Sequence, residues 1–197
     1  SKFQSKEILN TVVQRLGQLT EKPDHNNFSL IFTHTLLLQK NGQTEAALKQ
    51  LRKLERFESD PIQLALIESQ LLSELDRHKE AVQVLSKARK KFPDEIRLAI
   101  AHARKLTKIN LPRAEQELAI LLLESPENNE LLMAHALVAA ENKHLKTAEK
   151  SLKKLLTLQK EVSFAHYNLG LIAQQREDLD KALAHYEKVK QGQHYLP

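Results

Sequence analysis

Alanine recurs at a nearly constant interval along the chain, and apolar residues follow each alanine at helical spacing. The alanines of this ladder are Ala47, Ala81, Ala114, Ala148 and Ala182. Residues four and seven positions later are also apolar, as Leu152 and Leu155 are after Ala148. A fixed period of about 34 residues indicates one supersecondary unit copied along the chain, which excludes most folds with a single closed core.

Residues 163–190 show the repeated unit most clearly. The spacing of an amphipathic helix picks out one stripe, and a second stripe follows a break at Glu177 and Asp178. The two stripes are His166, Leu169, Gly170 and Ala173, then Leu179, Ala182, Tyr186 and Val189. Gly170 and Ala182 are small enough to let two helix backbones approach closely, so we predict a pair of packed helices in each unit.

Prolines and caps separate the predicted helices. Three prolines stand at or just before new first helices, namely Pro61, Pro93 and Pro126. Asn110 and Pro112 suit the start of the second helix around Ala114, as a cap and a first-turn residue. The first helix near 62–75 fits two registers, which both stay open: Ala65, Glu68, Ser69 and Leu72, or Leu64, Ile67 and Leu71.

Residues 5–20 predict one more amphipathic helix before the first complete unit. Its predicted apolar face carries Ile8, Val12, Leu16 and Leu19. We interpret the segment 1–22 as the second half of an upstream repeat, with a cap of the array as the alternative. The chain opens with Ser1, and the repeat pattern is cut at both ends, so we expect a piece of a longer protein.

Composition agrees with helices and excludes several kinds of site. The chain has only 4 Gly and 6 Pro, and it is rich in good helix formers. It has no Cys, which excludes disulfides, thiolate metal sites and cysteine nucleophiles. No run approaches the roughly 20 apolar residues that a membrane span needs, so we expect no membrane contact through this segment. Lys and Arg exceed Asp and Glu by 30 to 25, a mildly basic balance.

The segment 163–190 resembles a tetratricopeptide repeat (TPR), because Leu169-Gly170 and Ala182 with Tyr186 match the pattern of that family. His166 stands where the family has an aromatic residue, and Ala173 where it has Tyr. The resemblance implies an all-α, right-handed superhelical solenoid of antiparallel helix pairs, with about five repeats after the N-terminal helix. The predicted array spans 23–197, with repeats at about 28–60, 61–93, 94–127, 128–161 and 162–197.

One row of first-helix residues is predicted to line the inner, concave face of the solenoid. The row is Phe32, Leu36, Gln39, Leu66, Gln70, Ala99, Ala103, Met133, Leu137, Tyr167, Leu171 and Gln174. This row is mostly apolar, so we expect a groove that binds a partner protein or peptide, with the glutamines orienting the partner's backbone. The alternative is that neighbouring first helices cover the row. Lys and Asn at the positions of the carboxylate-clamp class of TPRs are missing, except Asn168, so we expect no co-chaperone role of that type.

Four histidines fall on predicted buried stripes: His34, His102, His135 and His166. They lack a His-Glu-x-x-His motif and a matching carboxylate set, so we predict hydrogen-bonded core histidines and no metal site. Buried neutral histidines would make stability fall at low pH. The sequence shows no glycine-rich phosphate loop, nucleophile elbow or carboxylate pair, so we predict no catalysis and no cofactor. Glu68 is explained by the open register of its helix.

Basic residues gather on predicted second helices, as at Lys87–Lys91 and Lys146–Lys154. Glutamates are interspersed and base-stacking aromatics are missing, so we predict a solvated face and no nucleic-acid binding. An acidic partner or a membrane surface is the alternative for these residues.

The leading hypothesis is therefore a non-enzymatic scaffold or adaptor for protein–protein interactions. Two rivals stay open: a self-assembly module that associates through the array ends, and a helper domain of a larger enzyme or complex. The closing residues 193–197 are similar to bacterial TPR proteins, which include envelope lipoproteins that act as adaptors for periplasmic enzymes. This similarity leaves a periplasmic and a cytoplasmic location both open.

Overall fold

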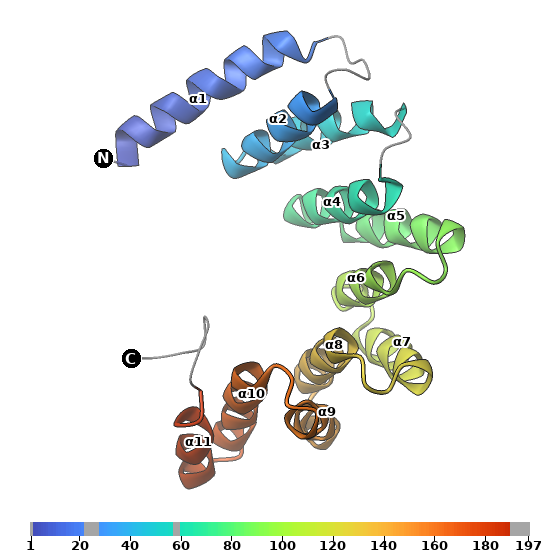
Figure 1. Ribbon diagram of the computed structural model, residues 1–197, viewed down its shortest axis with the longest axis vertical. Coiled ribbons are helices and arrows are strands. Elements are labelled where there is room, and N and C mark those ends of the chain that lie inside the picture. The colour runs from blue at the N-terminus through green and yellow to red at the C-terminus, as the bar shows by residue number, and fades with distance from the viewer. Residues whose placement is uncertain (1, 22–27, 57–59, 190–197) are drawn as a thin grey trace. The chain divides into compact units, whose positions relative to one another are not determined.

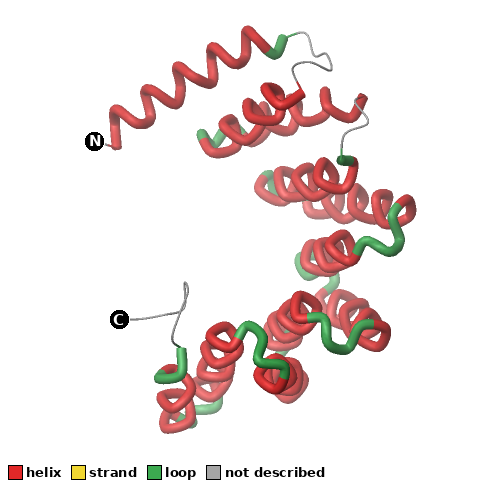
Figure 2. Tube along the Cα trace, viewed as in Figure 1, coloured by secondary structure: helices red, strands yellow, loops and turns green. Residues whose placement is uncertain are grey.

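A computed structural model of the chain describes residues 2–21, 28–56 and 60–189. Within these ranges every regular element is a helix and no strand occurs, which confirms the predicted all-α class (Figures 1 and 2). The elements are α1 (Lys2–Leu19), α2 (Phe28–Lys40), α3 (Thr44–Arg52), the 3-10 turn η2 (Lys53–Arg56), α4 (Pro61–Glu74), α5 (His78–Lys91), α6 (Ile96–Leu106), α7 (Leu111–Glu124), α8 (Asn129–Glu141), α9 (Leu145–Thr157), α10 (Val162–Gln175) and α11 (Leu179–Tyr186). The closing segment 193–197 lies outside the described residues.

The chain divides into two compact units, residues 1–105 and 106–197, which are described separately. The first unit holds the packed pairs α2/α3 and α4/α5, and the second holds α8/α9 and α10/α11. The predicted repeat 94–127 contains α6 and α7. The boundary between the units falls after residue 105, so α6 apart from its last residue belongs to the first unit and α7 belongs to the second. The boundaries of the individual repeats stay a prediction.

Side-chain caps start four of the helices. Asp60, Asn110, Asn128 and Asp178 each accept a hydrogen bond from the backbone N–H three residues later, at 3.0–3.2 Å. Pro61 and Pro112 occupy the first turns of α4 and α7, where the missing N–H costs nothing. The predicted roles of Asn110 and Pro112 are thus confirmed, and each cap contributes about 1 kcal/mol.

The turns between paired helices repeat one backbone feature. The residue five positions before the ladder alanine has a positive φ in four units: 77° at Gly42, 57° at Asp76, 64° at Lys143 and 62° at Glu177. Glycine adopts this left-handed region without cost, whereas other residues pay roughly 1–2 kcal/mol. Of these four turns, only the first therefore has glycine, the residue that a positive φ favours.

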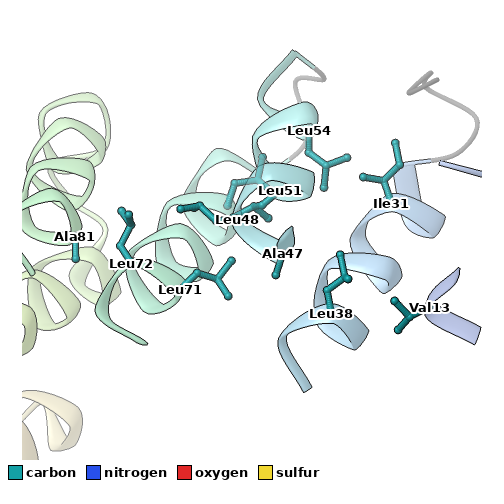
Figure 3. Packing of buried hydrophobic residues seen from close by; sticks show 11 residues of the cluster. Val13, Ile31, Leu38, Ala47, Leu48, Leu51, Leu54, Leu71, Leu72 and Ala81 are labelled. Atoms are coloured by element: carbon teal, nitrogen blue, oxygen red, sulfur yellow. The ribbon is translucent and has the colours of Figure 1, made fainter. Parts of the chain in front are cut away.

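The ladder alanines form the interior of both units. All five are buried, and Ala47 lies in a cluster with Ile31 and Leu38 of α2 and with Leu71 and Leu72 of α4 (Figure 3). The small side chain lets α3 lie close to the helix before it and the helix after it. The period of the alanine ladder therefore marks the crossing points of the helices, as predicted.

Helix α4 uses both of the registers that the sequence left open. Ala65, Ser69 and Leu72 of the first register are buried, and so are Leu64 and Leu71 of the second. The two faces are both covered because α4 packs against α3 and α5. Its half-buried Glu68 forms an ion pair with Arg52 of α3 at 2.9 Å, so burial of this carboxylate is compensated.

Helix α1 forms as predicted, but its predicted apolar face is not the face that is buried. Ile8, Val12 and Leu19 are exposed, whereas Val13 and Thr20 are buried against α2. The reason is the ladder itself: Val13 lies one repeat period before Ala47, and Thr20 lies one period before Leu54. The Thr20 hydroxyl hydrogen-bonds to Nδ1 of His34 at 2.9 Å, which fixes this rotation of α1.

In the second unit, a close crossing joins α10 to α11. The ring of Tyr186 lies over Gly170, so a Cβ at position 170 would come within 2.7 and 2.9 Å of Cδ1 and Cζ of that ring. The ring centre of Tyr186 is also 6.1 Å from that of Tyr167, and its hydroxyl donates to Oε1 of Gln174 at 2.8 Å. Glycine at position 170 thus leaves room for the ring of Tyr186.

Candidate functional site

In the first unit, the predicted row is only partly available to a partner. Leu36 and Gln70 are exposed, and Phe32, Gln39 and Leu66 are half-buried. Phe32 stacks on Phe28 with ring centres 6.2 Å apart. Ala99 and Ala103 of α6 are buried and offer no surface to a partner. The apolar part of the row in this unit therefore centres on Leu36.

A hydrogen-bonded chain links the first helices of this unit. Glu74 accepts from Gln39 of α2 at 2.7 Å and from Gln70 of its own helix at 3.1 Å. Lys105 of α6 donates to Oε1 of Gln70 at 2.6 Å. Burial, followed by the nearby charge of Arg104, lowers the pKa of Lys105. The two glutamines are therefore already bonded to neighbouring repeats, which the sequence did not indicate because Glu74 and Lys105 each lie a full repeat further along the chain.

In the second unit, the row has two exposed leucines. Leu137 of α8 and Leu171 of α10 are 38% and 41% exposed, while Met133 packs partly into the core. Tyr167 is half-buried beside Tyr186, and the exposed Gln174 is held by the hydroxyl of Tyr186. Burial, followed by the neighbouring Tyr167, raises the pKa of Tyr186. The leucines are therefore the open part of the row, and Tyr167 and Tyr186 join α10 to α11.

The exposed leucines of the two units share one position in the repeat. Leu36, Leu137 and Leu171 each lie eleven positions before the ladder alanine of their own unit. All three are 38–41% exposed. Gln70 and Ala103 occupy the same position in the two intervening units. Leu137 and Leu171 thus mark a candidate binding surface in the second unit, and Leu36 marks the corresponding position in the first.

The predicted buried histidines have local partners. His34 bonds to Thr20, His102 to Ser86 and Arg89, and His135 to Ser151, at 2.8–3.1 Å. These three are buried, as predicted, and burial is the largest cause that lowers the pKa of His34 and of His135. They act as hydrogen-bonded core residues that join helices.

His166 differs, because it is half-buried and pairs with a second histidine. Its Nδ1 is 3.0 Å from Nδ1 of His185 on α11. Burial and the charge of His185 lower the pKa of His166. Within the described ranges, no group of three or more His, Asp or Glu residues could hold a metal ion.

A buried carboxylate that the sequence did not reveal lies in α7. Glu115 accepts hydrogen bonds from Asn142 Nδ2 at 2.6 Å and from His144 Nδ1 at 2.8 Å. Burial opposes ionisation of this carboxyl, but the two hydrogen bonds outweigh it, so the pKa of Glu115 lies below its ordinary value. Glu115 thus ties α7 to the turn between α8 and α9.

The basic segments of the second helices are exposed and mixed with acidic residues. Lys87, Lys90 and Lys91 lie on α5, and all three are exposed. On α9, Lys153 pairs with Glu149 and Lys154 with Glu127, at 3.8 and 3.2 Å. These pairings favour the predicted solvated face.

Two grooves lie away from the predicted row. One, of about 700 Å³, lies between α3, α4 and α5, with an apolar floor that includes Leu64, Ala88 and Phe92. The other lies between α1 and the end of α2 and is lined by Ile8, Leu9, Val12, Leu37, Lys40, Asn41 and Gly42. No row residue lines either groove. None of the helices in the described part of the chain has the length and apolarity to cross a membrane.

Comparison with known proteins identifies the repeat. A family model described as tetratricopeptide repeat matches residues 165–191. A search of curated proteins gave no match. The fold is similar to that of a tetratricopeptide repeat protein from Parabacteroides merdae ATCC 43184, with 17% identity, a TM-score of 0.73, and coverage of 95% of this chain and 72% of that one.

Two further solved structures share the fold. TTC0263, a thermophilic TPR protein of Thermus thermophilus, has 20% identity and a TM-score of 0.64, over 81% of this chain and 88% of that one. A MamA fragment (residues 41 to the end) from Desulfovibrio magneticus RS-1 has 23% identity and a TM-score of 0.61, over 82% of this chain and 92% of that one.

Proposed function

The chain has the tetratricopeptide repeat fold, and we propose that it is a non-catalytic scaffold that binds a partner protein through the first-helix row. Proteins of this fold generally serve as scaffolds for protein–protein interactions. The proposal for this chain rests on Leu36, Leu137 and Leu171, which stay exposed at one position of three repeats. The row is the face that the sequence predicts to be concave.

Binding would proceed by burial of apolar side chains of the partner against these leucines. Burying a leucine side chain fully is worth roughly 1.5–3 kcal/mol, so a few such contacts support micromolar affinity after the cost of association is subtracted. The buried titratable groups Glu115 and His135 are engaged in the core, which favours a binding role over a catalytic one. Gln39 and Gln70 are bonded within the chain, so we assign them to holding neighbouring first helices in register.

The proposal is tested with charged substitutions at the exposed leucines. Leu137→Glu and Leu171→Glu introduce a charge into the surface without disturbing the core, whereas a charge at Tyr167 would also disturb its contact with Tyr186. The control is Leu123→Glu on α7, because Leu123 is 82% exposed and lies outside the row.

The measurement is affinity capture from a lysate of the source organism with the wild type and the three variants, followed by mass spectrometry. We expect one partner that the wild type and Leu123→Glu retain and that both row variants lose at least tenfold. Circular dichroism melts of all four proteins show whether the array is intact. Equal capture by folded Leu137→Glu and Leu171→Glu proteins would contradict the proposal.

A further inference from the structure

Helix α1 carries an apolar stripe that nothing in the described chain covers. Ile8 and Leu19 are 65% and 63% exposed, and Val12 between them is also exposed. At about 100° per residue these three side chains and Arg15 fall on one face, about a third of a turn from the buried face with Val13. The groove beside α2 is lined by Ile8 and Val12, so the stripe continues into a hollow of the surface.

The stripe departs from the pattern of two other second helices, α5 and α9, although α7 exposes Ile120 at the position of Leu19. The ladder register places Val13 of α1 level with the ladder alanines, so Val12 and Leu19 can be compared across repeats. Their counterparts are Glu80 and Lys87 in α5, and Thr147 and Lys154 in α9. The outer face of α1 is therefore apolar where those helices are polar, which indicates that it faces another chain and not water.

Helix α11 exposes a second apolar stripe. Leu183, one residue after the ladder alanine, is 60% exposed, whereas its counterpart Leu48 in α3 is 1% exposed. Leu48 is buried because α4 packs against α3 (Figure 3). Leu179, one helical turn earlier on the same face, is exposed too, and Glu187 ends the stripe one turn later. In α3 the following helix covers this position of the repeat, whereas no described helix covers it in α11.

The charges within the two stripes are complementary. Arg15 lies among the apolar residues of α1, and Glu187 directly follows the last residue of α11. Neither Arg15 nor Glu187 forms an ion pair with the residues that the structure describes. An interface between the two stripes would pair an arginine with a carboxylate at the rim of an apolar centre.

We propose that two copies of this chain associate head to tail, with the α1 stripe (Ile8, Val12, Arg15, Leu19) of one copy on the α11 stripe (Leu179, Leu183, Glu187) of the other. In this contact the exposed apolar side chains of each stripe are buried against those of the other. Such a contact is heterologous, so it leaves one free stripe of each kind on a dimer and continues into longer chains or closed rings. The contact is independent of partner binding by the first-helix row.

The interface is small, because one helix face meets another, and a weak association follows. Sedimentation velocity of the wild type from about 1 µM to about 1 mM covers the range of such affinities. We expect the weight-average mass to rise steadily with concentration beyond that of a dimer. A wild type that stays monomeric throughout would overturn the proposal and assign the stripes to a different occupant.

Two charged variants test the head-to-tail geometry. Ile8→Glu blocks only the α1 stripe, and Leu183→Glu blocks only the α11 stripe, so each protein alone should be monomeric. An equimolar mixture should form dimers and nothing larger, because one intact stripe of each kind remains. The matched controls are Gln14→Glu and Ala184→Glu, exposed positions on the same two helices outside the stripes, and these should associate like the wild type.

A mixture of the two variants that stays monomeric would overturn the proposal. So would a Leu183→Glu protein that still associates while Ile8→Glu does not, because that result indicates a symmetric contact between two α1 helices. As a charge test, Arg15→Glu and Glu187→Arg should each weaken association several-fold. Mixing the two variant proteins should restore association, because the new glutamate on the α1 stripe of one chain can pair with the new arginine on the α11 stripe of the other.

Discussion

Replacement of Gly170 by alanine tests the helix crossing at the end of the second unit. Alanine is the better helix former, so the change alone would stabilise α10 by about 1 kcal/mol. The new Cβ, however, would come within 2.7 and 2.9 Å of ring carbons of Tyr186. Carbon atoms at optimal contact are about 3.5–4.0 Å apart, so the ring must move.

The cost of this movement follows from what Tyr186 contacts. Its hydroxyl would lose the hydrogen bond to Gln174, worth about 1 kcal/mol, and its ring would lose the contact with Tyr167, worth roughly 0.5–1.5 kcal/mol. Any remaining overlap adds strain of roughly 1–3 kcal/mol. After the helix gain is subtracted, we expect Gly170→Ala to lower the free energy of unfolding by roughly 1.5–4.5 kcal/mol.

A double-mutant cycle separates these contributions. Urea unfolding followed by circular dichroism is measured for the wild type, Gly170→Ala, Tyr186→Ala and the double variant. Without the ring, the added methyl group has room, so Gly170→Ala should stabilise the Tyr186→Ala protein by up to about 1 kcal/mol. The sign of the effect thus reverses between the two backgrounds. A stabilising or neutral Gly170→Ala in the presence of Tyr186 would refute this packing of α10 on α11.

Further predictions concern pH, turns, the core and the buried carboxylate. Because burial holds the pKa of His34 and His135 below the unfolded value of about 6.5, their contribution to stability is complete above that pH and is lost as the pH falls below it, so the melting temperature should fall between pH 7.5 and about pH 5; equal melting temperatures would contradict this. Lys143→Gly should stabilise the chain by up to about 1 kcal/mol in urea unfolding because of its positive φ, whereas Lys146→Gly inside α9 should destabilise it by about as much. Leu48→Ala should cost roughly 2–5 kcal/mol in the same assay, and a loss below about 1 kcal/mol would show that α4 does not cover this side chain. Glu115→Ala should cost roughly 1–3 kcal/mol at pH 7, because Asn142 and His144 lose their acceptor, and the loss should shrink as the pH falls below about 4.5; a pH-independent loss would contradict a role for the carboxylate charge.

The sequence predicted the fold through a pattern that depends on local geometry. Small residues favour close packing of two helices, and all five alanines of the ladder from Ala47 to Ala182 are buried. Helix caps such as Asn110 depend only on the next three residues and were also predictable. These features repeat along the chain and reinforce one another.

Features that depend on contacts between repeats were harder to predict. The buried face of α1 could not be predicted from apolarity, because Val12, Leu16 and Leu19 form a more apolar stripe than Val13 and Thr20, and apolarity alone does not reveal that Thr20 bonds to His34. The ladder extended by one further period to Val13 could have given the correct rotation.

The candidate site was predictable in outline but not in its polar detail. The exposed leucines of the row could be placed because they lie one step round the helix from the buried stripe. The bonds of Gln39 and Gln70 could not, because Glu74 and Lys105 are contributed by other turns and other repeats. Glu115 resembles an ordinary surface glutamate in sequence and becomes a buried one only when Asn142 and His144 pack over it.

The central claim is that the exposed leucines of the first helices contact a partner protein. It is tested most directly by a photo-crosslinking amino acid placed at Leu137, at Leu171 and, as a control, at Leu123 of α7. The account predicts that irradiation in a lysate of the source organism gives the same adduct from positions 137 and 171 and none from position 123. Adducts from position 123 alone, or different proteins captured at 137 and 171, would contradict it.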